Sequence, residues 1–497
     1  MSEGARYSFG ARDRSGVVVG LRVGQLAVLA SGAGAAMLLM LASHGSFPVG
    51  ALAAATLLVA VGCAVLPVGG RAVDEWCPVL LRWMLSGRAW RSTAPAEGEL
   101  VTARELLVDP QPSLPPTLRG VTILSVRIAG GACIGVVRDP RRRTFTAVIR
   151  VRGSSYALLS DREKSVQLAA WGTALSSLAY AGTPVASLQV VVRSVAEDPD
   201  GMARYLDQAG HDDAGSSLRA SYAGLVDAAA PVTQAQEVFV ALTISERRAG
   251  RAIAAAGGHD GGAITVLLRV LTQMQTQLGR AHIHVDGVLP PRLLALVLRE
   301  AWDPTAAHSL RRRSARDLAT AGTALHGAGP QSTMSSWRHL ITDGGCAHAT
   351  YWISEWPRIE VGPNFLVPLL LQSAVGLTFA VTMAPVDPRR AQRDLEAAQT
   401  AHRSDEMLRE KHGFRTTVSN RRQAESIEDR EREFVDGHAD YRFSGYLTVS
   451  AASVDALDAA CSDVEQQARN CRLDVRRMDG EHDLAFTYTL PLGRGLS

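Results

Sequence analysis

The chain has 497 residues, a net charge of +3, and arginine in place of nearly all lysine. A chain of this length exceeds one ordinary domain, so we expect two or three. The small net charge argues against a dedicated nucleic-acid-binding protein, for which a strongly basic surface is expected. With abundant alanine and glycine, the arginine excess indicates the codon usage of a high-GC genome rather than phosphate binding.

The cysteines are widely spaced and form no CxxC pair, so neither a zinc site nor a redox motif is supported. We interpret them as small buried residues of a protein in a reducing compartment. They are Cys63, Cys77, Cys133, Cys346, Cys461 and Cys471.

Two uncharged apolar runs dominate the first seventy residues, at about 23–43 and 48–68. Each run is long enough to cross a hydrocarbon core of ~30 Å as a helix, and helices satisfy their own backbone in lipid. A short uncharged connection joins them, while arginines precede the first run and follow the second. The positive-inside rule then places both termini in the cytoplasm. The sequence therefore predicts a multi-pass protein of the cytoplasmic membrane, anchored by a two-helix hairpin.

The apolar runs have two other interpretations. A signal peptide is disfavoured because a second, equally long run follows and no cleavage site is clear. A buried hairpin of a soluble protein is the alternative that stays open.

Residues 74–91 carry tryptophans and leucines among arginines. This pattern predicts a helix at the membrane surface, with an ordinary surface helix as the alternative. Residues 1–92 are thus the predicted anchor.

Beyond the anchor we expect a proline-rich linker at 93–119 and then an α+β region. The order of elements is mixed and does not fit a regular doubly wound sheet. Two cytoplasmic subdomains, 120–303 and 346–497, would be joined by an Ala/Gly/Arg-rich linker at 304–345. Predicted strands lie at 121–128, 133–138, 145–151, 187–195, 236–245, 282–285, 346–354, 376–383, 441–451, 473–478 and 484–490. Predicted helices lie at 161–180, 264–278, 293–302, 388–411, 419–435 and 454–471.

The two predicted helices at 388–411 and 419–435 form a charged region at 388–436, in which acidic and basic residues alternate. Such a pattern is typical of a solvated, salt-bridged helical hairpin. An arm that docks a partner protein is the alternative.

Nucleotide-binding chemistry finds no support in the sequence. A phosphate loop needs glycine before its lysine, but Glu163 precedes Lys164 and Glu410 precedes Lys411, and there is no other lysine. Two glycine pairs, 257–258 and 261–262, precede a predicted helix, where backbone amides can hold an anion. We interpret them as a flexible turn, because no strand of dinucleotide-binding type leads into them.

Histidines were considered as metal ligands. His282, His284 and Asp286 alternate on a predicted strand and would share one face. The polar face of an ordinary strand is the favoured interpretation, and 211–213 (His-Asp-Asp) is interpreted as a solvated turn. A GxSxG motif is absent as well. We therefore predict no enzyme activity and no catalytic, cofactor-binding or metal-binding residues.

The first ninety residues resemble a known family. Tyr7-Ser8-Phe9-Gly10 and Arg12-Asp13-Arg14-Ser15-Gly16 run into the membrane hairpin. This arrangement is similar to the PrgI-like small membrane proteins of type IV secretion systems, in the fused form seen in actinobacteria.

The soluble part resembles the N-terminal, non-motor domain of the VirB/TrbE/CagE conjugation ATPases. The likeness covers most of residues 120–492 and rests on the order of short motifs. In that family a RecA-like motor follows, so the resemblance implies a split arrangement with the ATPase on another polypeptide. The motifs are Gly153–Asp161, Trp171, Ser187–Val195, Glu355-Trp356-Pro357, Thr378–Pro385, Tyr446–Val449, Ala485-Phe486 and Leu490-Pro491-Leu492.

From these resemblances we expect a structural component of a type IV secretion or conjugation system that docks a separate ATPase at the inner membrane. Its partners would be the lipid bilayer, the ATPase and channel subunits, with no direct sequence-specific nucleic-acid binding; a homo-oligomer stays open. The alternatives are an EccE-like component of a type VII secretion system and a membrane-bound enzyme with an unrecognised site.

Overall fold

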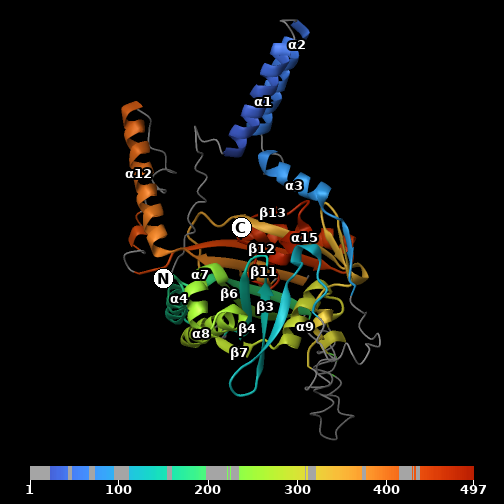
Figure 1. Cartoon of the computed structure of the whole chain (residues 1–497), viewed down its shortest axis with the longest axis vertical. Coiled ribbons are helices and arrows are strands. Elements are labelled where there is room, and N and C mark those ends of the chain that lie inside the picture. Colours follow the sequence, from blue (N-terminus) through green and yellow to red (C-terminus); the bar gives the residue numbers. More distant parts are fainter. Residues whose placement is uncertain are drawn as a thin grey trace. The chain divides into compact units, whose positions relative to one another are not determined.

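The chain folds into two compact units in the computed structural model, one mainly of residues 23–88 and one mainly of residues 89–496. Each unit is considered by itself below (Figure 1). The structure describes residues 23–42, 47–65, 73–93, 111–153, 159–196, 221, 224, 234–307, 309–311, 321–371, 376–412, 428, 430–432 and 437–496.

The smaller unit begins with two apolar helices, α1 (Val23–Ala42) and α2 (Phe47–Val65), which pack against each other as the sequence predicted. The stretch Gly24–Leu41 is long and apolar enough to cross a membrane, a criterion that a signal sequence also meets. The apolar stretch of α2, Val49–Ala64, is shorter.

Gly32 lets the two helices approach closely, because a Cβ built on it would lie 2.2 Å from Cβ of Ala60. A Gly32→Leu substitution is therefore expected to destabilise the helix pair by about 1–3 kcal/mol through overpacking. Gly34→Leu is the matched control, since no atom lies within 4 Å of a Cβ there. The measurement is thermal unfolding of the purified full-length chain in detergent. Equal unfolding temperatures of both variants would contradict the packing described here.

The third helix, α3 (Val73–Leu85), has an exposed apolar side that includes Leu81, Met84 and Leu85. The guanidinium of Arg88 lies 4.0 Å from the ring centre of Trp83, a cation–π contact. The predicted helix is confirmed but ends earlier than expected, because the following residues form a short strand. Its placement at a membrane surface stays a prediction.

The larger unit is built on one antiparallel sheet of 13 strands (Figure 1). The strand order is β1-β8-β9-β10-β12-β11-β5-β6-β4-β3-β2, with β13 paired to β10 and β7 paired to β4. The α+β class predicted from the sequence is therefore confirmed. The strands are β1 (Ala89–Arg91), β2 (Thr122–Arg127), β3 (Cys133–Asp139), β4 (Thr144–Arg152), β5 (Val185–Ala196), β6 (Gln234–Ser245), β7 (His284–Val288), β8 (Ser332–Ser335), β9 (Leu340–Thr342), β10 (Ala347–Glu355), β11 (Gly376–Pro385), β12 (Tyr441–Ala451) and β13 (Asp474–Arg477).

Helices cover one face of this sheet. Side chains alternate between faces along a strand, so Val240 and Leu242 of β6 share a core with α8, while Leu447 of β12 packs with α14. The direct pairing of Phe379 with both Val192 and Leu447 places these cores on the same face. The helices of this face are α4 (Asp161–Ser176), α7 (Glu246–Ala255), α8 (His259–Arg280), α11 (Val367–Leu371) and α14 (Val454–Asn470).

The opposite face is covered by α9 (Pro291–Trp302) and by the C-terminal residues 486–492. Phe239 and Ala241 of β6 point to this side and pack with Trp302 and Phe486 in a second core. The ring centres of Trp302 and Phe486 are 4.4 Å apart. A helix and an irregular C-terminal segment therefore close a face that contains the functional candidate below.

The closing strand predicted at 484–490 is wrong. Residues His482–Ala485 form a short helix, α15, and Phe486–Tyr488 form a 3-10 turn. The alternation of apolar and polar residues that suggested a strand instead directs Phe486 into the core. Side chains of the sheet hydrogen-bond the backbone here, as when Gln189 donates to the carbonyl of Tyr488 at 2.7 Å.

Other expectations differ in detail. The linker expected at 304–345 contains β8 and β9, so these residues take part in the sheet. The charged helix α12 (Pro388–His412) is confirmed. Most of the second charged helix, 419–435, and most of the proline-rich linker lie outside the described residues.

Candidate functional site

The C-terminal segment, residues 486–495, lies on a polar part of the sheet face. Threonines of neighbouring strands pair there through their hydroxyls, Thr350 with Thr448 at 2.9 Å, and Thr489 of the segment joins them at 2.8 Å. The hydroxyl of Tyr446 donates to the carbonyl of Gly495 at 2.8 Å. Buried polar groups of the sheet thus find partners in the segment, as they must when water is excluded.

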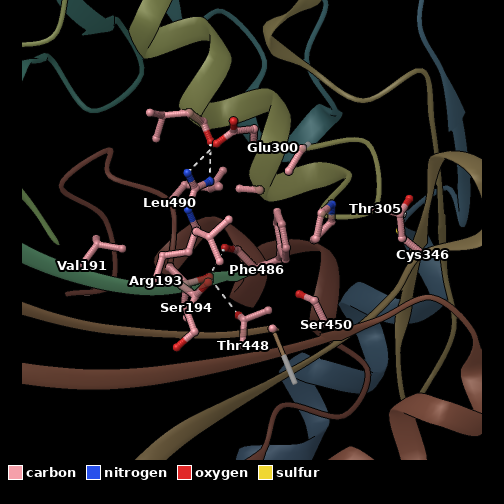
Figure 2. A pocket seen from close by; sticks show the side chains of 18 of the residues that line it. Val191, Arg193, Ser194, Glu300, Thr305, Cys346, Thr448, Ser450, Phe486 and Leu490 are labelled. Carbon is pink, nitrogen blue, oxygen red and sulfur yellow. Dashed lines mark hydrogen bonds and ion pairs between the residues drawn. The ribbon is translucent and has the colours of Figure 1, made fainter. Parts of the chain in front are cut away.

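A cavity of about 260 Å³ lies between this face, α9 and residues 486–491 (Figure 2). Its floor follows the register of the strands, because Thr378 pairs directly with Arg193 on one side and with Thr448 on the other. In the next row Gly376 pairs with Ser450. The floor keeps open space beside Ser450, since glycine contributes no side chain. Apolar walls come from Val191, Phe239, Val297, Phe486 and Leu490.

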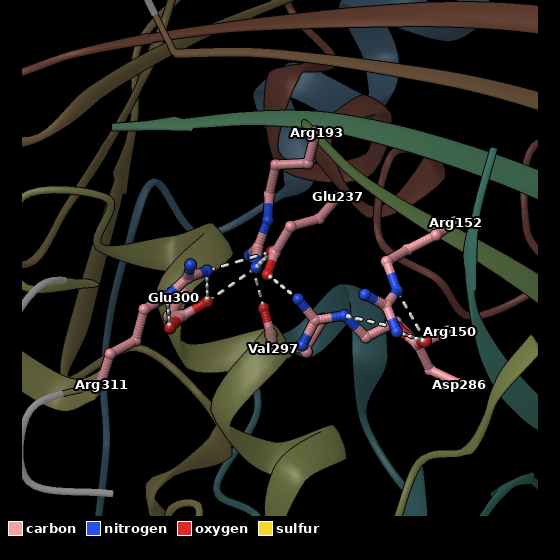
Figure 3. Close-up of polar contacts among 8 residues, drawn as sticks. All are labelled: Arg150, Arg152, Arg193, Glu237, Asp286, Val297, Glu300 and Arg311. Carbon is pink, nitrogen blue, oxygen red and sulfur yellow. Dashed lines mark hydrogen bonds and ion pairs between the residues drawn. The ribbon is translucent and has the colours of Figure 1, made fainter. Parts of the chain in front are cut away.

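Arg193, Glu237, Glu300 and Arg311 form a buried arginine–glutamate cluster (Figure 3). Two of its members, Arg193 and Glu300, line the cavity. One nitrogen of Arg193 contacts both glutamates, each at 2.6 Å. Arg311 donates to Glu300 at 2.6 Å and to Glu237 at 3.0 Å. The two glutamates are only 3% and 6% exposed, so these ion pairs are shielded from water. The cluster joins β5, β6 and α9.

The carboxylate of Glu237 is held ionised by its arginine neighbours. Burial alone would raise the pKa of Glu237, but the charges of Arg193 and Arg311 lower it below its usual range. Burial likewise opposes the charge of Arg311, whose pKa is nevertheless raised by its hydrogen bonds to Glu300. Arg150 extends the pairing to the surface by donating to Glu237 at 3.0 Å. The cluster therefore carries compensated charge.

His348 lies beside the cavity, fully enclosed between two hydroxyls. Its Nδ1 is 2.8 Å from Oγ of Ser450 and its Nε2 is 2.8 Å from Oγ1 of Thr342. Because Thr342 donates its proton to the carbonyl of Trp302, it accepts from Nε2–H, and Nδ1 then accepts from Ser450. Burial lowers the pKa of His348 to about 4. So weak a base does not activate a serine at neutral pH, and the pair acts as a buried polar link.

The low pKa of His348 predicts a pH dependence of stability. The folded-state pKa lies below the unfolded value of about 6.5, so unfolding takes up a proton between these values. Stability is complete above about pH 6.5 and should fall toward pH 4 by at most about 1.4 kcal/mol per pH unit. Urea unfolding of the full chain in detergent at several pH values measures this. His348→Gln should flatten the profile, while His284→Gln, at an exposed position, should leave it unchanged; equal profiles for all three proteins would contradict the assignment.

The first glycine pair, 257–258, forms the expected turn between α7 and α8, whereas the second pair, 261–262, lies in the first turn of α8 itself. Gly258 has φ +72°, a conformation that glycine adopts without strain. A Cβ on Gly262 would lie 2.5 Å from the carbonyl oxygen of Ile253. These glycines therefore serve the turn and the close packing of two helices, which accounts for them without a ligand.

Of the three candidate metal ligands, His284 and Asp286 lie close together, with 3.5 Å between Nε2 and Oδ1. His282 precedes β7 and has φ +56°, while His284 is exposed on the strand. Asp286 accepts a hydrogen bond from Arg152 at 2.7 Å. Within the described residues, no group of three or more His, Cys, Asp or Glu side chains is placed to hold a metal ion. Residues 211–213 lie outside that part of the chain.

Neither the cavity nor the arginine–glutamate cluster is among the features predicted from the sequence. Two local signals could have indicated the cluster. Arg193 directly follows three valines at 190–192, and Arg299 with Glu300 interrupts the apolar stretch 293–302. A charge inside an apolar strand or helix is either paired or functional, since an unpaired buried charge is costly.

Comparisons with protein-family models and with curated proteins found no match for this chain. The site is therefore interpreted from its own geometry. That geometry comprises a compensated ion cluster, a neutral histidine and a cavity with apolar walls and a hydroxyl-bearing floor. The cluster and the histidine stabilise the junction of sheet, α9 and C-terminal segment.

Proposed function

We propose that this chain is a membrane-anchored structural component of a type IV secretion or conjugation system, which holds a separate ATPase at the inner membrane. The exposed apolar surface of the helix pair carries the proposal. Leu38 of α1 and Leu58 of α2 are 70% and 71% exposed. Apolar surface of this extent is unfavourable in water and favourable in a bilayer.

The remaining features fit a surface-anchored scaffold. In this proposal α3 lies at the headgroup level, with Leu81, Met84 and Leu85 toward the acyl chains and Arg82 toward water. The larger unit provides the contact surface for the motor. The sequence of the chain contains no GxxxxGK[ST] loop, so ATP hydrolysis is assigned to the partner. The order of motifs in residues 120–492 supports the choice of a conjugation ATPase as that partner.

The test is fractionation followed by affinity purification of the tagged full-length chain from its native host. We expect the chain in carbonate-washed membranes, and a conjugation ATPase or channel subunit among the proteins that co-purify after solubilisation. Leu38→Arg places a charge in α1 at an apparent cost of about 2.5–3.5 kcal/mol and should reduce membrane recovery. Leu371→Arg, at a residue 63% exposed in the larger unit, is the matched control and should not.

Three results would overturn the proposal. The first is a chain that fractionates as soluble without detergent. The second is ATP turnover by the purified chain alone. The third is recovery of type VII secretion subunits in place of a conjugation ATPase, which would favour the EccE-like alternative.

A further inference from the structure

The cavity beside α9 has a chemical character that the proposed scaffold function does not use, and the inference drawn from it does not rest on that function. Two of its hydroxyls, on Ser194 and Thr378, have no hydrogen-bond partner in the described part of the chain. Both residues line the cavity, so a molecule bound there can pair with their hydroxyls.

The occupant should be uncharged. The charged side chains at the cavity are already compensated, because Glu300 accepts from Arg193 and Arg311 at 2.6–2.8 Å. His348 is neutral above about pH 4. An ionised ligand would lose its hydration without gaining a free counter-charge, and that loss is costly. A neutral molecule does not incur this penalty.

The occupant should also have an apolar body. Phe486 and Leu490 of the C-terminal segment line the cavity over the sheet, and Phe239 of β6 adds an aromatic ring from the sheet itself. Aromatic walls with a few placed polar groups are typical of small-molecule sites, and about 260 Å³ suits a compound of one or two rings. Water alone would leave much of this apolar wall unfavourably hydrated.

We propose that the cavity is a binding site for a small uncharged molecule with an apolar ring and an amide-type polar group. An amide presents one N–H donor and one carbonyl acceptor. The hydroxyls of Ser194 and Thr378 can each donate or accept, so they match both. The apolar ring lies between the aromatic walls. Binding would rigidify the junction of the sheet, α9 and the C-terminal segment, because all three line the cavity.

The probes are acetanilide, which has a ring and an amide, and propylbenzene, which lacks the amide. Saturation-transfer NMR with the full chain in lipid nanodiscs measures their binding. For wild type we expect saturable acetanilide binding with a dissociation constant on the order of a few millimolar. Ala301→Phe, at a cavity-lining residue of α9, should weaken it about tenfold or more. Ala252→Phe, on the exposed side of α7, is the control and should not change it.

Thr378→Val keeps the size of the side chain and removes the hydroxyl. It should weaken acetanilide about threefold to tenfold while leaving propylbenzene unchanged, a difference that a loss of fold does not produce. The proposal is overturned by absence of saturable binding to wild type, which would assign the cavity to water. Equal affinity of Ala301→Phe and wild type would place the binding elsewhere. Equal effects of Thr378→Val on both probes would contradict recognition of the amide by the Thr378 hydroxyl.

Discussion

Replacing Glu300 by glutamine is expected to lower the free energy of unfolding by about 3–5 kcal/mol. Glu300 is 3% exposed and accepts hydrogen bonds from both Arg193 and Arg311. Without its charge, two arginines face Glu237 as the nearest remaining carboxylate of the cluster. Breaking a buried pair costs more than the pair contributes, because the remaining charge stays out of water. Urea unfolding of the full chain in detergent, followed by tryptophan fluorescence, measures the change.

The matched control for this prediction is Glu246→Gln. Glu246 pairs with Arg143 at 3.1 Å, and the two side chains are 25% and 55% exposed, far more than those of Glu300 and Arg193. Water screens such a pair, so the change should cost at most about 1 kcal/mol. A second check combines Glu300→Gln with Arg311→Met, whose effects should not add because both residues belong to one network. Equal losses for Glu300→Gln and Glu246→Gln would show that burial of the cluster is not what stabilises it.

Regular elements of the fold could be predicted wherever local pattern and tertiary environment agree. The alternation in Tyr441–Ala451 gave the bounds of β12, and the charged run from Pro388 gave α12 to within a residue. In both elements the residue pattern that predicts the structure lies within the element itself. The strand expected at 484–490 is wrong for the opposite reason. Its backbone is hydrogen-bonded by side chains that lie far away in sequence, such as that of Gln189.

The candidate site could not be predicted because it depends on strand register. Thr378 lies beside Arg193 only when β11 pairs with β5 in the observed register, and a shift by one residue would turn its hydroxyl to the other face. Nothing local to Thr378 encodes this neighbour. The same holds for Ser450, whose partner His348 comes from β10. The sequence shows these residue types, whereas the sheet decides which of them meet.

The C-terminal segment should be highly sensitive at Gly493. This residue has φ +65°, and a Cβ built on it would lie 1.9 Å from Oγ1 of Thr243. Its N–H donates to Gln189 at 2.8 Å, and its carbonyl accepts from Ser187 at 3.2 Å, so the backbone cannot easily move away. Gly493→Ala therefore combines left-handed strain of about 1–2 kcal/mol with overpacking of about 1–3 kcal/mol. The expected loss in the free energy of unfolding is about 2–5 kcal/mol, measured by urea unfolding of the full chain.

Two further variants separate these contributions. Gly437 has φ +83° with no atom within 4 Å of a built Cβ, so Gly437→Ala should show the strain alone. Thr243→Ala removes the hydroxyl that Gly493→Ala would meet, at the expense of its 2.9 Å hydrogen bond to Thr146. In the double variant the steric part should be relieved, so its loss should be smaller than the sum of the single losses. Additive losses, or a Gly493→Ala effect no larger than that of Gly437→Ala, would mean that the C-terminal segment is not held against the sheet at this point.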